Sequence, residues 1–410
     1  MQLLELTKNE ENMLLGKEGK GTQLAMEIII KLGELYGAER LIPISQVHID
    51  GCLYAAVGEA GLLFAEKLHK LEAKVRVPTS LNATSRDIDD WMEHGVDPSF
   101  AQMSARLEGY YLGMGAIPTW TCAPYQSGLV PRFGEQIAWA ESNAIVYVNS
   151  VIGARTERYG DYTDICCAIT GRVPEFGLHR TENRAGQILF DCSNLKLKPT
   201  TDYFAVLGYL VGEIAKDKIP VIKGIPHWVS GDHLKAFSAA IASSGAVALF
   251  HMIGITPEAL NEHTAFQGRK PEKTYDLSQK MLQEVEEKLS SIETTQVDGV
   301  LIGCPHASVP EILELVKLMK GKKVKENKEF WVYTSRSVHY LLTLNGIIPE
   351  LEQKGVRIFK DTCFVNTDLG KWNFKNVMTN SAKYAHYITG RTGLNVVFAS
   401  LDKCLETVVE

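Results

Sequence analysis

The chain contains 410 residues, which is too many for one simple hydrophobic core and predicts two or three domains. A hydrophobic fraction of 45% and a charged fraction of 22% are ordinary for a soluble globular protein. The net charge of -6 offers no basic surface to nucleic acid and argues against binding to an anionic membrane.

The chain also lacks sequence signals for membrane insertion and secretion. No apolar run approaches the ~20 residues that a membrane-spanning helix needs, and the first residues lack the charged and apolar blocks of a signal peptide. The 8 cysteines do not form the pattern of a disulfide-stabilised small domain. We therefore expect a cytoplasmic protein whose cysteines are reduced.

The first part of the chain alternates helix and strand patterns. Thr7, followed three residues later by Glu10, can cap a first helix. An apolar stripe at helical spacing comes next and consists of Leu24, Ile28, Leu32 and Leu35. We then expect a strand at 41–44, a helix led by 58–61, a strand at 74–77, helices at 100–114 and 135–142, and a strand at 144–148.

The same alternation continues to the end of the chain. We expect helices at 203–214 and 232–244, and strands at 187–191, 220–222, 246–251, 300–302 and 330–333. The highly charged segment 261–296 predicts surface helices and a domain boundary. The pattern as a whole predicts an α/β protein with mostly parallel sheets, divided into a first lobe (1–200), a second segment (201–295) and a third unit (296–410).

Three cysteines follow apolar runs at predicted strand ends. Cys304 follows a buried strand and Gly303, ahead of a helix that we expect to begin at Pro305 with Ser308 and Glu311 as its caps. Cys122 and Cys363 end similar runs. Polar groups at the carboxyl ends of parallel strands lie at one edge of a sheet, and the positive end of a helix favours a thiolate.

Each of these cysteines alone is more often a buried structural residue. As a set, Cys122, Cys304 and Cys363 can be thiolate ligands of an iron–sulfur cluster, either 4Fe-4S or a smaller form. Three ligands leave one iron with an open position for Lewis-acid chemistry. Zinc is the alternative metal, although the chain has no Cys-x-x-Cys pair. We expect the remaining cysteines to be structural.

Several polar residues near predicted strand ends are candidates for substrate binding and proton transfer. Arg336 and Arg155 can each bind a carboxylate through a planar fork, although a surface arginine is the more common case. Lys383 can bind an anionic group, and His48 and Asp50 can exchange protons. The polar residues around Gly153 indicate a site, for which a helix cap with a solvated loop is the alternative.

A set of segments, read together, resembles the aconitase X family. They include Gly-Cys-Pro-His at 303–306 and Asp-Thr-Cys at 361–363, and the others lie at 48–54, 119–125, 134–144, 149–156 and 378–383. The similarity extends over essentially the whole chain. It implies an aconitase-like catalytic core of three α/β domains around a central cleft, a dehydratase activity, and Cys122, Cys304 and Cys363 as cluster ligands.

The resemblance implies two possible substrates. Bacterial members of the family dehydrate cis-3-hydroxy-L-proline, and archaeal members dehydrate mevalonate 5-phosphate. Segments 48–54, 159–165 and 396–401 are more similar to the bacterial type, which favours the proline substrate. The small swivel domain of the family is not visible in this sequence. The chain is therefore expected to be a large subunit with a small swivel-domain partner, which we expect to dock near 379–387.

The expected reaction removes a proton next to a carboxylate and expels the neighbouring hydroxyl, whose developing charge a Lewis acid must stabilise. The resemblance suggests that Arg336 or Arg155 holds the carboxylate. The base is a serine of the partner or, within this chain, His48, Asp50 or Ser150. Further substrate-binding candidates are Asn82, Asn143, Asn149 and Lys383. The rival class is a metal-binding or scaffold subunit without chemistry of its own.

Overall fold

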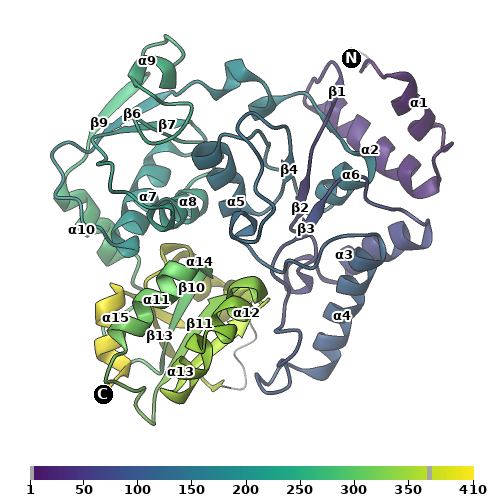
Figure 1. Ribbon diagram of the computed structural model, residues 1–410. Coiled ribbons are helices and arrows are strands. Elements are labelled where there is room, and N and C mark those ends of the chain that lie inside the picture. Colours follow the sequence, from purple (N-terminus) through teal and green to yellow (C-terminus); the bar gives the residue numbers. More distant parts are fainter. Residues whose placement is uncertain (1–3, 367–371) are drawn as a thin grey trace.

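The computed structural model describes residues 4–366 and 372–410, and it confirms the predicted α/β fold with mostly parallel sheets. Three units follow one another along the chain, each built around its own parallel sheet (Figure 1). The third unit lies below the second in this view, with the first to the right. Within the described residues, no helix combines the length and apolar character needed to cross a membrane.

The first unit holds a parallel sheet in the order β3 (Thr79–Leu81), β2 (Val47–Ile49) and β4 (Ala138–Trp139). Strands β1 (Leu41–Pro43) and β5 (Arg172–Pro174) pair antiparallel beside it. The helices are α1 (Lys8–Leu14), α2 (Lys20–Leu35), α3 (Tyr54–Lys70), α4 (Pro98–Gly113), α5 (Ser142–Tyr147) and α6 (Thr163–Thr170). The predicted Thr7 cap is confirmed, because Thr7 and Glu10 form a capping box.

The second unit is a parallel sheet in the order β8-β7-β6-β9. Its strands are β6 (Ile188–Asp191), β7 (Pro220–Lys223), β8 (His251–Met252) and β9 (Lys273–Asp276). Its helices are α7 (Thr201–Ala215), α8 (Gly231–Ser244), α9 (Glu262–Ala265) and α10 (Gln279–Lys288). The charged segment 261–296 therefore contains an edge strand, β9, which our prediction of surface helices missed.

The third unit is a five-stranded parallel sheet in the order β12-β11-β10-β13-β14. Its strands are β10 (Gly299–Ala307), β11 (Glu329–Thr334), β12 (Val356–Lys360), β13 (Asn376–Thr379) and β14 (Asn395–Phe398). Its helices are α11 (Val309–Leu318), α12 (Arg336–Leu344), α13 (Ile347–Gln353), α14 (Ala382–Thr392) and α15 (Leu401–Val408).

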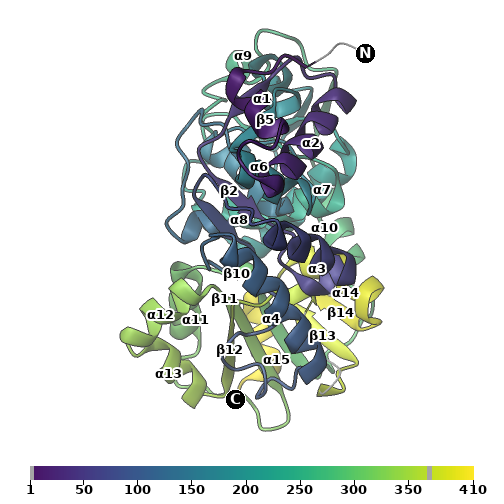
Figure 2. The same cartoon turned by 90° about the vertical axis from the view of Figure 1, so that its right-hand side faces the viewer.

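The hydrophobic cores show how the units are joined. The largest core cluster is shared by the second and third units and includes Phe237, Phe250 and Trp331. The first unit has its own core, which includes Met26 and Leu107. Figure 2 shows α3 and α4 of the first unit extending to the level of the third unit. The segment between β3 and α4 contacts the third unit there through backbone hydrogen bonds described below.

Several predicted elements of the first unit are wrong. Residues 74–77 form no strand, and a short strand, β4, replaces the predicted helix at 135–142. The predicted strand at 144–148 lies in α5 and the start of a π-helix, Val148–Ile152. All residues of this segment except the partly exposed Tyr147 are buried, and such an apolar run has no period that separates strand from helix. The buried face of α2 is also shifted, because Ala25 and Ile29 are buried whereas Leu35 is 76% exposed.

The strand that carries Cys304 also differs from its prediction. Strand β10 continues through Gly303 and Pro305 to Ala307, with a register shift against β11 between Ile302 and Ala307. Gly303 has a φ of 97°, and a Cβ atom there would lie 2.2 Å from the Tyr333 carbonyl oxygen. The irregular stretch thus requires glycine and carries Cys304 out of the regular ladder. Helix α11 begins only at Val309, where Ser308 and Glu311 form the predicted capping box.

Candidate active site

Cys122, Cys304 and Cys363 are brought together from three separate segments. Cys122 follows a segment that hydrogen-bonds to β3, and its Sγ accepts the backbone N–H of His306 at 3.3 Å, two residues beyond Cys304. The Cys363 backbone N–H donates to the Thr84 carbonyl of the first unit at 2.9 Å. None of the three cysteines forms a disulfide, and all are half-buried. Their residues therefore meet where the first unit joins the third.

The spacing of the three thiols differs from that around a single metal ion. Zinc–sulfur bonds of about 2.3 Å place any two ligand sulfurs within about 4.6 Å of each other. In the described part of the chain, the one group of three metal-ligating atoms that all lie within 4.8 Å of one another is Asp87, Asp89 and Asp361. The three thiols are therefore too widely spaced to share one ion as they stand. This arrangement fits a cluster of several metal atoms, with each thiol bound to a different atom.

Burial dominates the electrostatic environment of the thiols. Burial raises the pKa of Cys122, the nearby Cys304 charge raises it further, and the Lys383 ammonium opposes this rise. Burial likewise raises the pKa of Cys304 to about 12, while the Lys383 ammonium opposes this rise and the Cys363 charge adds to it. Without a bound cation the thiols keep their protons, and binding of a metal must release them.

A buried ion pair lies beside the thiols. The Lys383 ammonium contacts Glu141 Oε1 at 2.6 Å and Ser142 Oγ at 3.1 Å. Lys383 lies in the first turn of α14, and Glu141 is the N-cap of α5, accepting the Ala144 N–H at 2.9 Å. Glu141 is only 4% exposed. Our sequence analysis missed Glu141, because it placed this residue inside a predicted helix at 135–142 and glutamate is not among the residues preferred at a helix N-cap.

Asn143 supports the Cys122 turn. Its Nδ2 donates to the Cys122 carbonyl at 3.1 Å and also to Glu141, and its Oδ1 accepts the Tyr125 hydroxyl at 3.3 Å. The side chain is fully buried. Its hydrogen bonds are thus directed to protein groups around the site, which makes Asn143 part of the wall that fixes the Cys122 turn and the Lys383–Glu141 pair.

A second polar group consists of His48 within β2 and of Asp50 and Asn82, which follow β2 and β3. Asn82 donates to the Asp50 carboxyl, and burial, reinforced by Glu141 and Asp161, raises the Asp50 pKa well above its ordinary value. His48 Nδ1 lies 2.8 Å from Ser80 Oγ, and burial lowers the His48 pKa to about 4. In the described residues, His48 Nε2 is buried without a hydrogen-bond partner. The His48 carbonyl accepts the backbone N–H of Ala140, the residue before Glu141, at 3.2 Å, and the Glu141 charge raises the pKa of both His48 and Asp50.

Asn149 and Ser150 lie in the π-helix and have structural partners. Ser150 Oγ accepts the Phe250 N–H at 2.9 Å. Asn149 Nδ2 donates to the carbonyls of Thr156 and Ala248, each at 3.0 Å, while its Oδ1 accepts from Arg184. These bonds join the first unit to the segment before β8. The geometry therefore favours His48 and Asp50 over Ser150 as groups that exchange protons near the thiols.

The two arginine candidates differ in their surroundings. Arg155 lines a separate polar pocket with Arg40, Glu175 and His179, and it donates to Thr181 Oγ1 at 2.8 Å. Arg336 forms a two-point ion pair with Asp361, through Nε at 2.8 Å and Nη2 at 2.6 Å.

The side chains around Arg336 carry a net negative charge. Lys360, its cationic neighbour, contacts three carboxylates, those of Asp87, Asp89 and Asp90. With Asp361, four acids thus surround two bases. This excess of negative charge argues against a substrate carboxylate at Arg336 and indicates that the guanidinium holds the turn that leads to Cys363.

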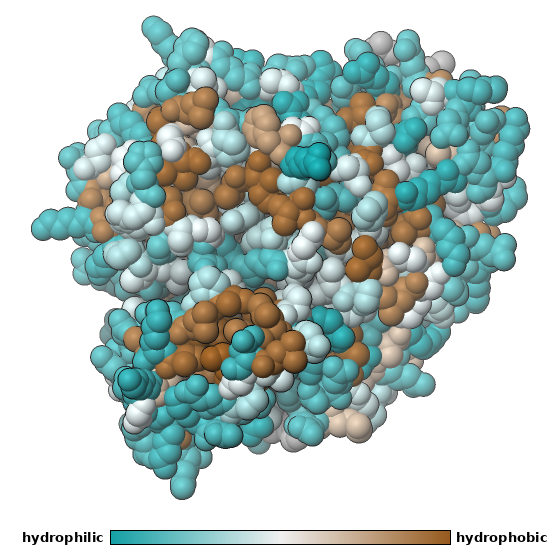
Figure 3. Space-filling view, viewed as in Figure 1, coloured by the Kyte–Doolittle hydropathy of each residue, from teal (hydrophilic) through white to brown (hydrophobic). Residues whose placement is uncertain are grey.

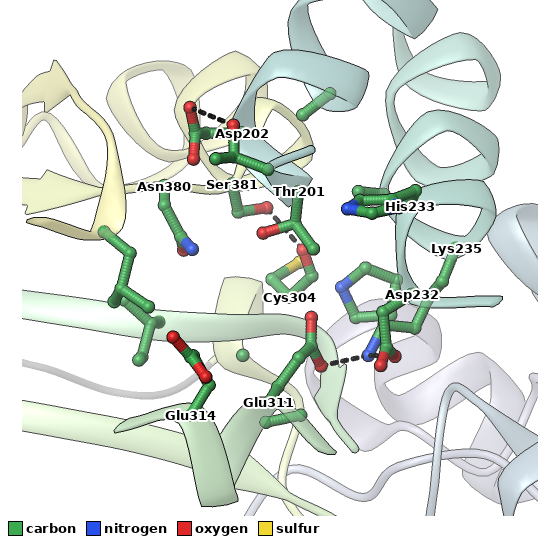
Figure 4. Close-up of a pocket in the computed structure, with 18 of the residues that line it drawn as sticks. Thr201, Asp202, Asp232, His233, Lys235, Cys304, Glu311, Glu314, Asn380 and Ser381 are labelled. Atoms are coloured by element: carbon green, nitrogen blue, oxygen red, sulfur yellow. Dashed lines mark hydrogen bonds and ion pairs between the residues drawn. The ribbon is translucent and has the colours of Figure 1, made fainter. Parts of the chain in front are cut away.

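A cavity of about 310 Å³ adjoins the thiol site where the second unit meets the third. Figure 4 shows the neighbours of Cys304 in this cavity: Thr201 and His233 come from the second unit, and Glu311 and Asn380 come from the third. Cys304 and Lys383 also line it. Ligand pockets begin at roughly 300 Å³, so the cavity suits a small metabolite. A buried Lys235, paired with Asp232 and Glu311, closes one side (Figure 4).

Comparison with known proteins places this site in a family context. Family models match along the chain as "Aconitase X first domain" at residues 3–182, "Aconitase X second domain" at 186–287 and "Aconitase X third domain" at 297–410. A solved structure titled as Thermococcus kodakaraensis aconitase X in its holo-form superposes with a TM-score of 0.87 and 35% identity, covering 97% of this chain and 98% of that chain.

Curated relatives carry two names. A cis-3-hydroxy-L-proline dehydratase of Pseudomonas aeruginosa is 42% identical over 98% of this chain and 69% of its own length. The protein of the same name from Hypocrea jecorina is 40% identical over 99% of this chain and 69% of its own length. The phosphomevalonate dehydratase large subunit of Methanocaldococcus jannaschii is 35% identical over 98% of this chain and 99% of its own length.

Proposed function

The chain belongs to the aconitase X family and is a hydro-lyase, and from this premise we propose that it eliminates water from cis-3-hydroxy-L-proline with an iron–sulfur cluster held by Cys122, Cys304 and Cys363. The observation that carries the proposal is the meeting of three half-buried thiols from separate segments beside a buried Lys383–Glu141 pair. Their wide spacing supports a cluster over a single ion.

The charge of the site supports the proline substrate over mevalonate 5-phosphate. The cations in the described surroundings of the thiols are already paired, Lys383 with Glu141 and Lys235 with Asp232 and Glu311. An amino acid carries an ammonium and a carboxylate and adds no net charge to such a site. A phosphorylated acid adds several negative charges and needs unpaired cations. The identity to the relatives named for the proline substrate, 42% and 40%, points the same way.

The chemistry of the elimination divides between cofactor and chain. When bound, the cluster supplies a Lewis acid that accepts charge from the leaving hydroxyl. Asp50 keeps a proton because burial and Glu141 raise its pKa, so it can deliver that proton to the departing oxygen. A serine of the proposed partner accepts the proton from the carbon next to the carboxylate, and His48 Nε2, held by the Ser80 contact on the other ring nitrogen, is the alternative acceptor within this chain. The expected product is an enamine that rearranges to an imine.

We also propose a small partner subunit that closes the site and provides a serine base. The name "large subunit" of the phosphomevalonate dehydratase relatives supports it. The predicted docking segment 379–387 is mostly buried. An apolar patch instead covers α11 and α12 of the third unit (Figure 3). Its exposed side chains are Leu313, Tyr340, Leu341 and Leu344.

The function is tested by turnover of the anaerobically reconstituted chain with a co-expressed small subunit from the same genome. We expect brown protein that consumes cis-3-hydroxy-L-proline and leaves mevalonate 5-phosphate unchanged, with at least ~100-fold slower turnover when the small subunit is omitted, as expected for loss of a general base. Turnover of the phosphorylated substrate would assign the chain to the other activity. A colourless protein with stoichiometric zinc and no turnover would support the metal-binding or scaffold class.

Arg336→Lys separates carboxylate binding from support of the Cys363 turn. Lysine keeps the charge but cannot form the two-point pair with Asp361. We expect faster loss of iron on chelation, with KM within about twofold of wild type because uniform binding is unchanged. Iron release is followed with a ferrous chelator, and Arg155→Lys serves as the matched control. A KM raised at least tenfold with iron retention unchanged would restore the carboxylate role of Arg336.

A further inference from the structure

His306 contacts all three cysteine-bearing turns. It lies in β10, two residues after Cys304, and is 1% exposed. Its Nε2 lies 2.9 Å from the carbonyl oxygen of Thr362, the residue before Cys363, and its Nδ1 lies 3.1 Å from Oγ1 of Thr121, the residue before Cys122. Its backbone N–H donates to the Cys122 sulfur at 3.3 Å. One residue therefore joins segments that are far apart in the chain.

The partners of the ring determine which nitrogen carries the proton. A carbonyl oxygen can only accept, so Nε2 must be the donor to Thr362. Nδ1 is then an acceptor and receives the hydroxyl proton of Thr121. Thr121 Oγ1 in turn accepts the Ala123 N–H at 3.1 Å, so the imidazole orients a hydroxyl that itself spans the Cys122 turn. The ring is thus satisfied at both nitrogens in one tautomer.

The backbone carbonyl of His306 adds a link to the second unit. Lys235 of α8 donates to it at 3.2 Å and also pairs with Glu311 and Asp232. Every polar group of His306 is therefore engaged, two with the first unit, one with the second and one with the Cys363 turn. Sites that bind metals must hold their ligands within about 0.5 Å of the working geometry. The turns that carry Cys122, Cys304 and Cys363 come from separate segments, so a residue that contacts all three can hold them in one geometry.

We propose that His306 is a positioning residue that holds the Cys122 and Cys363 turns at fixed distances from Cys304, so that the three thiols can capture a cluster together. The inference rests on the proposed function in taking these thiols as the cluster ligands. Removing the imidazole releases the Thr121 hydroxyl and the Thr362 carbonyl together. The Cys122 and Cys363 turns then move independently, and the thiols bind a cluster more weakly and react more freely.

The chain offers a matched control for a buried histidine. His251 in β8 is 2% exposed and its Nε2 lies 2.7 Å from the Arg184 carbonyl oxygen, away from the three cysteines. The test compares His306→Gln with His251→Gln, alongside Thr121→Val, which removes the hydroxyl, and Thr121→Ser, which keeps it. Iron and sulfide are measured after anaerobic reconstitution and desalting. Iodoacetamide alkylation of Cys122, Cys363 and Cys192 is measured by peptide mapping in the metal-free protein.

We expect His306→Gln to retain less than a third of the wild-type iron and to alkylate at least fivefold faster at Cys122 and Cys363, with Cys192 unchanged. Thr121→Val should show the same changes to a smaller extent, and His251→Gln and Thr121→Ser should behave as wild type. Equal alkylation and equal iron in His306→Gln and His251→Gln would overturn the proposal. If wild-type protein binds no iron, the proposed cofactor fails, and the alkylation rates alone decide the role of His306. If His306→Gln does not fold, the comparison of iron content and alkylation rates between Thr121→Val and Thr121→Ser decides the role of His306.

Discussion

Replacing Cys122, Cys304 or Cys363 by serine is expected to remove bound iron and sulfide and to lower dehydration by at least ~1,000-fold. A Lewis acid contributes several kcal/mol to expulsion of hydroxide, and each ~1.4 kcal/mol is a factor of ten in rate. The hydroxyl of serine is a poor substitute for a thiolate ligand. Iron and sulfide are determined per chain after anaerobic reconstitution, and activity is measured on the same samples.

Two other buried cysteines provide the controls. Cys192 and Cys404 are 1% and 0% exposed and lie in hydrophobic clusters of the second and third units. Their serine variants are expected to be less stable, because a hydroxyl replaces a packed sulfur, but to keep their iron. A full complement of iron and sulfide in a serine variant of Cys122, Cys304 or Cys363 would remove that residue from the ligand set.

Replacing Lys383 by methionine is expected to cost about 3–5 kcal/mol of stability at pH 8, because it leaves the Glu141 carboxylate buried and without its counter-charge. The double variant Lys383→Met with Glu141→Gln is expected to recover much of the loss, since no buried charge remains. Free energies of unfolding of the metal-free protein are measured by urea denaturation for both variants and wild type. A loss below about 1 kcal/mol in the single variant would show that the pair is not held in a buried setting.

The same variant should reverse the pH dependence that comes from Glu141. Burial opposes ionisation in the folded wild type, but Lys383 and the hydrogen bonds around the carboxylate hold the Glu141 pKa below its ordinary value. Its stabilising contribution is therefore present above about pH 4.5 and is lost as the pH falls further. Without Lys383, burial raises the pKa, so stability falls as the pH rises. Lys383→Met is thus expected to be closer to wild type at pH 5 than at pH 8. An equal difference at both pH values would contradict this.

The fold class and the meeting of Cys304 with Cys363 were predictable because both follow from chain order, whereas Cys122 lies in an irregular loop of the first unit and joins them through a contact between units. Alternating helix and strand patterns require parallel strands, and parallel strands place their carboxyl ends at a common edge. Local capping was also predictable, as the Ser308–Glu311 box shows. The helix at 144–148 was not predictable, because an almost fully buried apolar run has no periodicity. Its cap, the Glu141 side chain that accepts the Ala144 N–H, is not a residue type that marks a helix start.

The arrangement inside the site was only partly predictable. Lys383 and Asn143 were named from the sequence, but their partner Glu141 was not, because an ion pair between residues 242 positions apart has no sequence signal. The role of His306 depends on Thr121 and Thr362, which are equally remote from it. Arg336 was predicted to bind substrate from its residue type, whereas its surroundings were set by acids from two other segments.

The wide separation of the three cysteines along the chain affects how the protein is made. The Thr84 carbonyl that holds Cys363 and the Cys122 thiol belong to the part of the chain that a ribosome synthesises first. At ~5–20 residues per second, the 241 residues from Cys122 to Cys363 take roughly 12–48 s to translate. For the first 182 of those residues Cys122 has neither companion thiol, and until Cys363 is made the set of three is incomplete. Binding of the cluster must therefore follow synthesis of the third unit and its exit from the ribosome. A nascent chain stalled before Cys363 is expected to carry no iron.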